Sequence, residues 1–70
     1  MPFFLIIIEK ANSNYSAYSP DLPGCVTIGK TREETLQNMR EAIKMHIHGL
    51  MEDNLPVPIP ASSAKYIAVA

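Results

Sequence analysis

The chain has 70 residues, one cysteine and a formal charge of −1, with seven acidic and six basic residues dispersed along it. This length predicts a single domain, residues 1–70, whose thin core a partner subunit would help to stabilise. One cysteine cannot form an internal disulfide, and we find neither a signal-peptide pattern nor an apolar run of about 18 residues. We therefore expect a cytoplasmic protein with no membrane partner and, because no basic patch is visible, no direct nucleic-acid binding.

The first 30 residues predict three antiparallel strands. Residues 3–10, FFLIIIEK, are apolar at both alternating sets of positions, which is typical of a strand buried on both faces. Turn residues at 11–14 separate this strand from an aromatic second strand over residues 15–19. Prolines and a glycine in PDLPG, residues 20–24, then interrupt the pairing before a third strand over residues 25–30.

A helix is predicted from Thr31 to about Asp53. Thr31 and Glu34 have the spacing of a capping box, in which the threonine hydroxyl accepts a hydrogen bond from the Glu34 N–H while Glu34 reaches back. Apolar residues then recur at helical spacing, which places them on one side of the helix: Leu36, Met39, Ile43, Ile47 and Leu50.

The segment after the helix predicts a stiff connector and a fourth strand. Prolines at 56, 58 and 60 favour an extended connector, and KYIAVA, residues 65–70, has strand composition. The resulting β-β-β-α-β order predicts an α+β fold, with a mostly antiparallel sheet of order 3-2-1-4 and one helix packed on one face.

One helix can cover only one face of this sheet, although the first strand is apolar on both. Exposed apolar patches usually mark interaction surfaces, so we expect the uncovered face to meet another copy of the chain in a dimer or tetramer. The candidate residues for this oligomer interface are Phe4, Ile6 and Ile8.

Two constellations could carry catalysis or a metal, and both favour a structural interpretation. A nucleophilic Cys25 needs a lowered pKa and a nearby base, but nothing in the sequence brings His46 or His48 towards it. A small buried residue at the start of a strand is the favoured interpretation of Cys25. On a helix, residues two apart point about 200° from each other, so the two histidines cannot share one ion.

Two nucleotide-related patterns are also set aside. Residues 24–31, GCVTIGKT, match the letters of a phosphate-binding loop, but residues 25–28 have strand composition rather than that of a glycine-rich coil. The predicted strand order is that of the start of an RNase H-type nuclease, whose metals need several converging carboxylates that the first and fourth strands lack. We therefore expect no enzymatic activity, no catalytic residues, no metal and no cofactor.

Residues 15–43 resemble the HicB-type antitoxin domain. The resemblance rests on an aromatic strand, the PDLPGC turn, a T-x-E-E helix start and an N-x-x-E-A-I helix, and the later LPVPIP resembles the family's proline-rich stretch. Lys30 departs from the family pattern, which often has an acid there. The positions that match the signature turn are Tyr18, Asp21, Leu22, Pro23, Gly24 and Cys25, and those that match the helix start are Thr31, Glu33 and Glu34.

The resemblance implies a partial RNase H-like fold without catalytic residues, in which the signature residues shape the domain. It also implies that the protein neutralises a small, basic HicA-type ribonuclease toxin by covering its active surface. Many such proteins carry a C-terminal DNA-binding domain, which is not expected here because the sequence stops at Ala70. The alternative is an orphan domain, structural or binding a small ligand, that self-associates and has no toxin partner.

Overall fold

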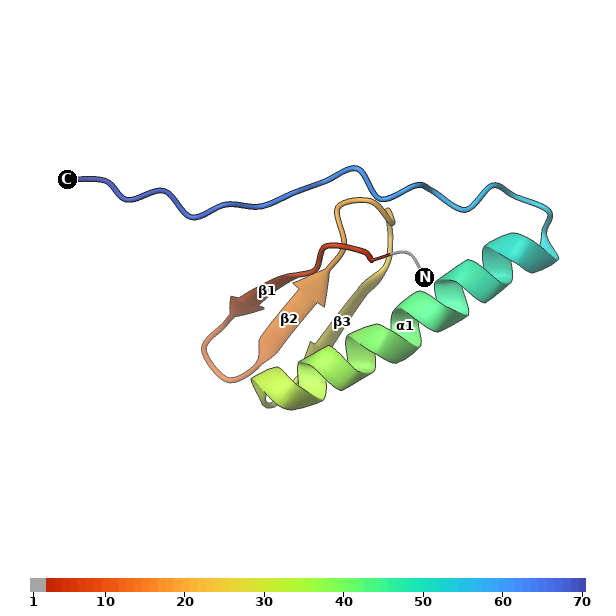
Figure 1. The fold of residues 1–70 in the computed structure, drawn as a ribbon. Coiled ribbons are helices and arrows are strands. Elements are labelled where there is room, and N and C mark those ends of the chain that lie inside the picture. The colour runs from red at the N-terminus through yellow and green to blue at the C-terminus, as the bar shows by residue number, and fades with distance from the viewer. Residues whose placement is uncertain (1–2) are drawn as a thin grey trace.

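Three short strands and one long helix make up the regular structure of residues 3–70, the part of the chain that the computed structural model describes (Figure 1). They are β1 (Ile7–Lys10), β2 (Tyr15–Tyr18), β3 (Val26–Gly29) and α1 (Arg32–Glu52). Both strand pairs are antiparallel, and the sheet order is β1-β2-β3. The predicted α+β class, the three-strand meander and the single helix are confirmed, with strands shorter than predicted.

The register of the sheet assigns each side chain to one of two faces. Ile8 lies opposite Ala17, which lies opposite Thr27, and these residues share the face that packs on α1. Their neighbours along the strands point the other way, because side chains alternate across a strand. We call this second side of the sheet the open face, and it carries Ile7, Tyr18, Val26 and Ile28.

The core lies between the sheet and α1. Its buried hydrophobic residues are Ala17, Leu22, Cys25 and Met39, and Phe4, Ile6, Ile8, Ala42 and Ile43 pack against them. Phe4, Ile6 and Ile8 are therefore not on the uncovered side, where the sequence predicts an oligomer interface. Because Ile8 pairs with Ala17, this alternating set points towards α1 and packs against the chain's own core while remaining partly exposed.

The junction between β3 and α1 is tightly packed. Thr31 is the N-cap of α1, and its hydroxyl accepts a hydrogen bond from the Glu34 N–H at 3.0 Å. Glu34 reaches back to the N–H of Lys30, one residue before the cap, at 3.1 Å. Buried Thr35 lies so close to Gly29 that a Cβ on this glycine would come within 2.5 Å of the Thr35 hydroxyl oxygen. Only glycine therefore fits at the end of β3.

The C-terminal part of the chain differs from the prediction. Residues 65–70 are extended but pair with no strand, so the structure contains neither the fourth strand nor the order 3-2-1-4. After α1 the proline-rich connector crosses near the loop between β2 and β3, and the chain then projects beyond the sheet (Figure 1). We call residues 63–70 the C-terminal segment.

Candidate interaction surface

The turn between β2 and β3 is fixed by its own hydrogen bonds and by two buried side chains. The Leu22 N–H donates to the carbonyl of Ser19 at 3.2 Å, and the Cys25 N–H donates to the carbonyl of Leu22 at 3.0 Å. The side chains of Leu22 and Cys25 are buried in the core, while Gly24 adopts a φ of +83°, which favours glycine. The turn is therefore anchored in the core by the side chains of Leu22 and Cys25.

Asp21 connects this turn to Ser62, the residue just before the C-terminal segment. Its carboxylate accepts hydrogen bonds from the N–H and the hydroxyl of Ser62, at 3.2 and 2.9 Å. Desolvation acts to raise the pKa of Asp21, but the bonds from Ser62 and from the backbone of Ala61 outweigh it, so the pKa lies below its ordinary 3.8. The ionised carboxylate is thus the form that holds Ser62.

The remaining predicted turn residues lie on the surface. Tyr18 ends β2 on the open face, and Pro23 is exposed at the tip of the turn. Cys25 is buried, as predicted, and burial raises the pKa of its thiol. His48 pairs with Glu52 one helical turn later.

The pattern GCVTIGKT does not form a phosphate-binding loop. Val26–Gly29 pairs with β2 along its length, and Thr31 uses its hydroxyl to cap α1. Within residues 3–70 no group of three or more His, Cys, Asp or Glu side chains is arranged to hold a metal ion. In the same range, no helix combines the length and the apolar character needed to cross a membrane.

The open face presents apolar side chains to solvent. Val26 and Ile28 are 66% and 63% exposed, and Tyr18 lies beside Val26 across the β2–β3 pairing. Ile28 also lines a shallow hollow together with Lys30 and with Glu34 of α1, so that one basic and one acidic residue border this apolar surface. A strip of this kind on a small protein is typical of an interaction surface.

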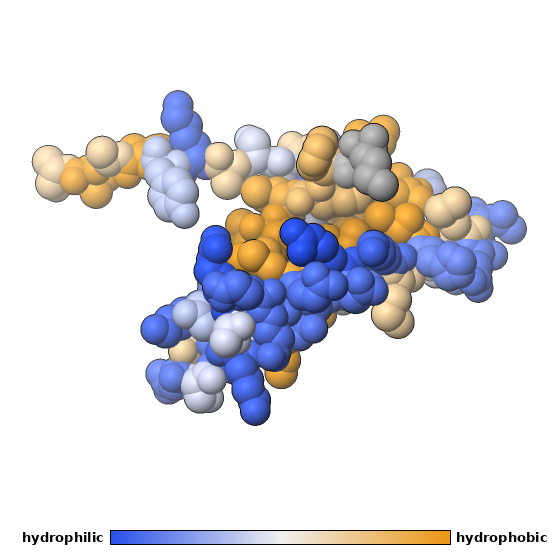
Figure 2. Space-filling model, turned by 60° about the horizontal axis from the view of Figure 1, so that its bottom comes forward, coloured by the Kyte–Doolittle hydropathy of each residue, from blue (hydrophilic) through white to orange (hydrophobic). Residues whose placement is uncertain are grey.

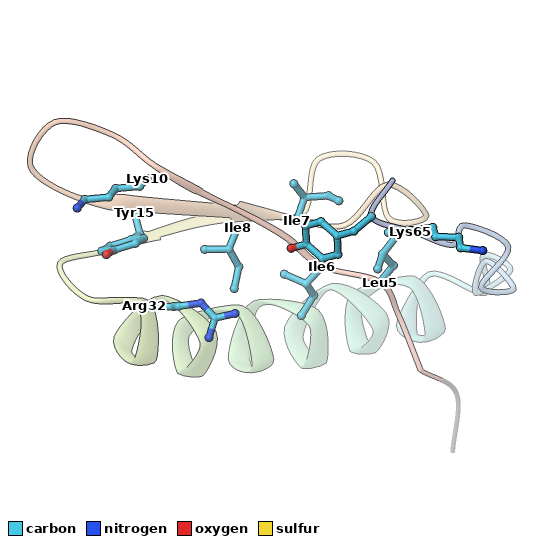
Figure 3. A pocket seen from close by; sticks show the side chains of 10 residues that line it. Leu5, Ile6, Ile7, Ile8, Lys10, Tyr15, Arg32 and Lys65 are labelled. Atoms are coloured by element: carbon cyan, nitrogen blue, oxygen red, sulfur yellow. The ribbon is translucent and has the colours of Figure 1, made fainter. Parts of the chain in front are cut away.

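A second apolar surface is a groove beside β1, which encloses about 590 Å³. Figure 3 shows Ile6, just before β1, and Ile8 of β1 pointing towards α1, Arg32 at the start of α1, and Lys65 of the C-terminal segment beside Leu5. The groove lining also contains Lys10 and Lys65 but no acidic residue. Figure 2 shows a hydrophobic area between the projecting C-terminal segment and a band of polar side chains.

Acidic side chains gather at both ends of α1. Glu33 and Glu34 lie in its first turn, Glu52 is its last residue and Asp53 is its C-cap, and all four are exposed. Acids in the first turn interact favourably with the helix dipole. Glu52 and Asp53 at the C-terminal end interact unfavourably with the dipole, and α1 has no basic residue in its last turn to compensate.

Sequence reasoning missed two features of these surfaces. The bond between Asp21 and Ser62 joins residues 41 apart, and no periodic pattern could have indicated it. The groove combines Arg32, Lys65 and Tyr66 with residues 5–8, and these meet only through the folded path of the connector. The apolar composition of KYIAVA is visible in the sequence, where it predicts a fourth strand of the same sheet, but its exposure is seen only in the structure.

This fold and these surfaces define a small α+β binding module, and the comparisons with known proteins give its family. A family model described as the HicB-like antitoxin of bacterial toxin-antitoxin systems matches residues 4–69. The chain belongs to this HicB-like antitoxin family, and the resemblance carried by residues 15–43 is thereby confirmed.

Three of the sequence relatives come from a phage, an archaeon and a bacterium. The chain is 42% identical over 62 residues to an uncharacterised 14.9 kDa protein of Haemophilus phage HP1, and this match covers 89% of the chain and 47% of the phage protein. It is 40% identical to a UPF0150 protein of Thermoplasma acidophilum, with 83% and 84% covered, and 45% identical to one of Helicobacter pylori, with 70% and 68% covered. The chain thus spans about half the length of the phage relative.

A solved structure has a similar fold. One chain of a HicA3 and HicB3 toxin-antitoxin complex superposes with a TM-score of 0.73 at 33% sequence identity, and the match covers 86% of this chain and 70% of that one.

Proposed function

We propose that this protein is a non-catalytic antitoxin that binds a small, basic HicA-type ribonuclease and occludes its active surface in the cytoplasm. The observation that carries the proposal is the match to a chain of the HicA3 and HicB3 complex, at 33% identity over most of the protein. Membership of the HicB-like antitoxin family supports the same role.

The open face is the surface that we assign to the toxin. Its apolar strip includes Val26 and Ile28, and hydrophobic burial would supply affinity there. Glu34 borders Ile28, and Glu33 lies beside it in the first turn of α1. These carboxylates, which lie among the cations Lys30 and Arg32, could pair with basic side chains of a ribonuclease surface that binds RNA phosphates.

The mechanism is competition for that basic surface. Acidic side chains at the border of the open face would steer the toxin by electrostatic complementarity, which mainly raises the association rate. The apolar strip would then exclude water and RNA from the same area. No residue of this protein needs to react chemically, and Tyr18, Asp21 and Cys25 would serve to shape the domain.

The test is co-purification with the small basic protein encoded beside this chain, followed by an RNA-cleavage assay. We expect a stable complex and loss of cleavage when the antitoxin is added. Ile28→Lys, which places a cation and removes an apolar contact on the open face, should raise the Kd at least tenfold and restore cleavage. Met45→Lys is the matched control, because Met45 is exposed on the polar side of α1.

Equal loss of binding in both variants would contradict the assignment of the open face. If no neighbouring basic protein binds the wild-type chain, the antitoxin role itself fails. An orphan self-associating domain would then be the better description.

A further inference from the structure

β1 is an edge strand, and no strand among residues 3–70 pairs with its outer side. It pairs with β2 alone among the described strands, so the backbone N–H and C=O groups of its other edge have no strand partner. Such an edge is a template for the addition of another strand. The apolar groove lies along this edge and includes Leu5, Ile6 and Ile8.

The C-terminal segment resembles a strand that lacks a partner, and so complements the unpaired edge of β1. Tyr66 is fully exposed, and Ile67 and Val69 are 77% and 88% exposed, although β-branched and aromatic residues favour strands. The segment is extended and contains no proline or glycine. It therefore has the composition and the backbone form of a strand while burying almost none of its apolar side chains.

The path of the chain determines where this segment can reach. Ser62 is held by Asp21, and Ala64, Lys65 and Tyr66 line the groove. Beyond Tyr66 the segment runs in the same general direction as β1 and extends past the sheet, away from its own domain (Figure 1). The most apolar part of the C-terminal segment thus projects away from the folded domain of its own chain.

We propose that the C-terminal segment of one copy adds as a strand to the β1 edge of a second copy, and that the exchange is reciprocal. Each chain carries both an unpaired β1 edge and an unpaired strand-like segment. In two copies related by a twofold axis, the segment of each copy can therefore pair with β1 of the other. Ile67 and Val69 then enter the groove and contact Ile6 and Ile8 of the other copy.

The area buried by this exchange is sufficient for a specific dimer. Burying Tyr66, Ile67 and Val69 removes on the order of 100 Å² from water for each side chain. Two segments and the two grooves that they cover then bury about 1,200 Å², which is the lower limit for specific protein interfaces. One segment alone would bury about half of this area, so the exchange must be reciprocal to be stable.

The test compares three forms of the full chain, without toxin, by light scattering over a concentration series. We expect the wild type to be a dimer at micromolar concentration and the double variant Ile67→Asp, Val69→Asp to dimerise at least tenfold more weakly. Ile59→Asp is the matched control, because Ile59 is an equally exposed residue of the same tail that lies before the Ser62 contact. The control should dimerise like the wild type, and circular dichroism should be the same for all three.

A mixed sample of isotope-labelled and unlabelled chains identifies the contact directly. We expect intermolecular nuclear Overhauser effects between the methyl groups of Ile67 or Val69 and those of Ile6 or Ile8. Purely intramolecular effects would overturn the proposal, because the segment would then close on its own β1, as would a monomeric wild type. The toxin assay described above is independent of this result, since Ile28 lies on the open face.

Discussion

Ser62 donates two hydrogen bonds to the carboxylate of Asp21, from its N–H at 3.2 Å and from its hydroxyl at 2.9 Å. These bonds link the β2–β3 turn to a tail that otherwise pairs with no strand. They fix the point from which the C-terminal segment leaves the domain.

Removing the Asp21 carboxylate should therefore release the tail and leave the sheet intact. For Asp21→Ala we expect lower backbone heteronuclear Overhauser values over residues 60–66, with little change within β1, β2 and β3, under conditions in which the chain is monomeric. Ser62→Ala should have a smaller effect because it keeps the bond from the backbone N–H. Ser63→Ala, at the exposed neighbouring position, is the control, and equal mobility in that variant would refute the role of the Asp21–Ser62 pair.

The same contact predicts a response to acid. The folded-state pKa of Asp21 is lowered, so its contribution to tail ordering is present above the ordinary value of 3.8 and is lost as the pH falls through the lower folded pKa. We expect the order of residues 60–66 to be unchanged between pH 5 and pH 7 and to decrease below about pH 4. A change centred near neutral pH would contradict this assignment, because Asp21 does not titrate there.

Substitution of Gly29 tests the packing of β3 on α1. A Cβ at this position would approach the Thr35 hydroxyl oxygen to 2.5 Å and the Thr35 backbone nitrogen to 2.8 Å. Gly29→Ala should lower the free energy of unfolding by about 1–3 kcal/mol, the usual cost of overpacking. Urea denaturation at a fixed chain concentration measures this change.

Gly49→Ala is the matched control for that experiment. Gly49 lies in α1, and an added Cβ would meet nothing within 4 Å. Because alanine is the better helix former, this variant should raise the free energy of unfolding by about 1 kcal/mol. The free energy of unfolding should therefore fall for Gly29→Ala and rise for Gly49→Ala. If both variants are destabilised, the contact with Thr35 is not the cause of the Gly29→Ala effect.

The N-cap of α1 can be tested at one residue. Thr31→Ala removes the acceptor for the Glu34 N–H and should cost about 1 kcal/mol of stability. Thr31→Ser retains a hydroxyl and should remain within a few tenths of a kcal/mol of the wild type. If both variants lose stability equally in urea denaturation, the hydroxyl is not the stabilising group.

The thiol of Cys25 should be protected as long as the domain is folded. It is buried, and burial raises its pKa, so little reactive thiolate is available. We expect alkylation by iodoacetamide to be at least ~100-fold slower in buffer than in urea, because it requires opening of the core. A Ser63→Cys thiol in a Cys25→Ala background should react quickly in both, and fast native reaction of Cys25 would contradict its burial.

The sequence was sufficient for the elements that depend on local patterns. Strand composition bounded by turn residues predicted three strands, and the spacing of Thr31 and Glu34 together with the apolar repeat predicted α1. The sequence could not show which of the two alternating sets of side chains in the first strand faces the core. Phe4, Ile6 and Ile8 are as apolar as Leu5 and Ile7.

Long-range contacts were not predictable in the same way. Strand composition in residues 65–70 is compatible with pairing inside or outside the chain, and only the folded structure shows that no internal pairing occurs. The position of Ser62 beside Asp21, and hence one side of the groove, depends on the path of the connector.

The side-chain amide of Asn38 donates a hydrogen bond to the carbonyl of Ile28 at 2.9 Å, and α1 packs along β3. The protein's own helix thus partly covers the border of the sheet at β3, while no strand among residues 3–70 pairs with the border at β1. Unlimited growth by strand pairing at sheet edges, as in a fibril, requires that every molecule has two unpaired edge strands. Assemblies of this protein built through strand borders should consequently stop at a closed pair, which limits aggregation despite the many apolar residues at its surface.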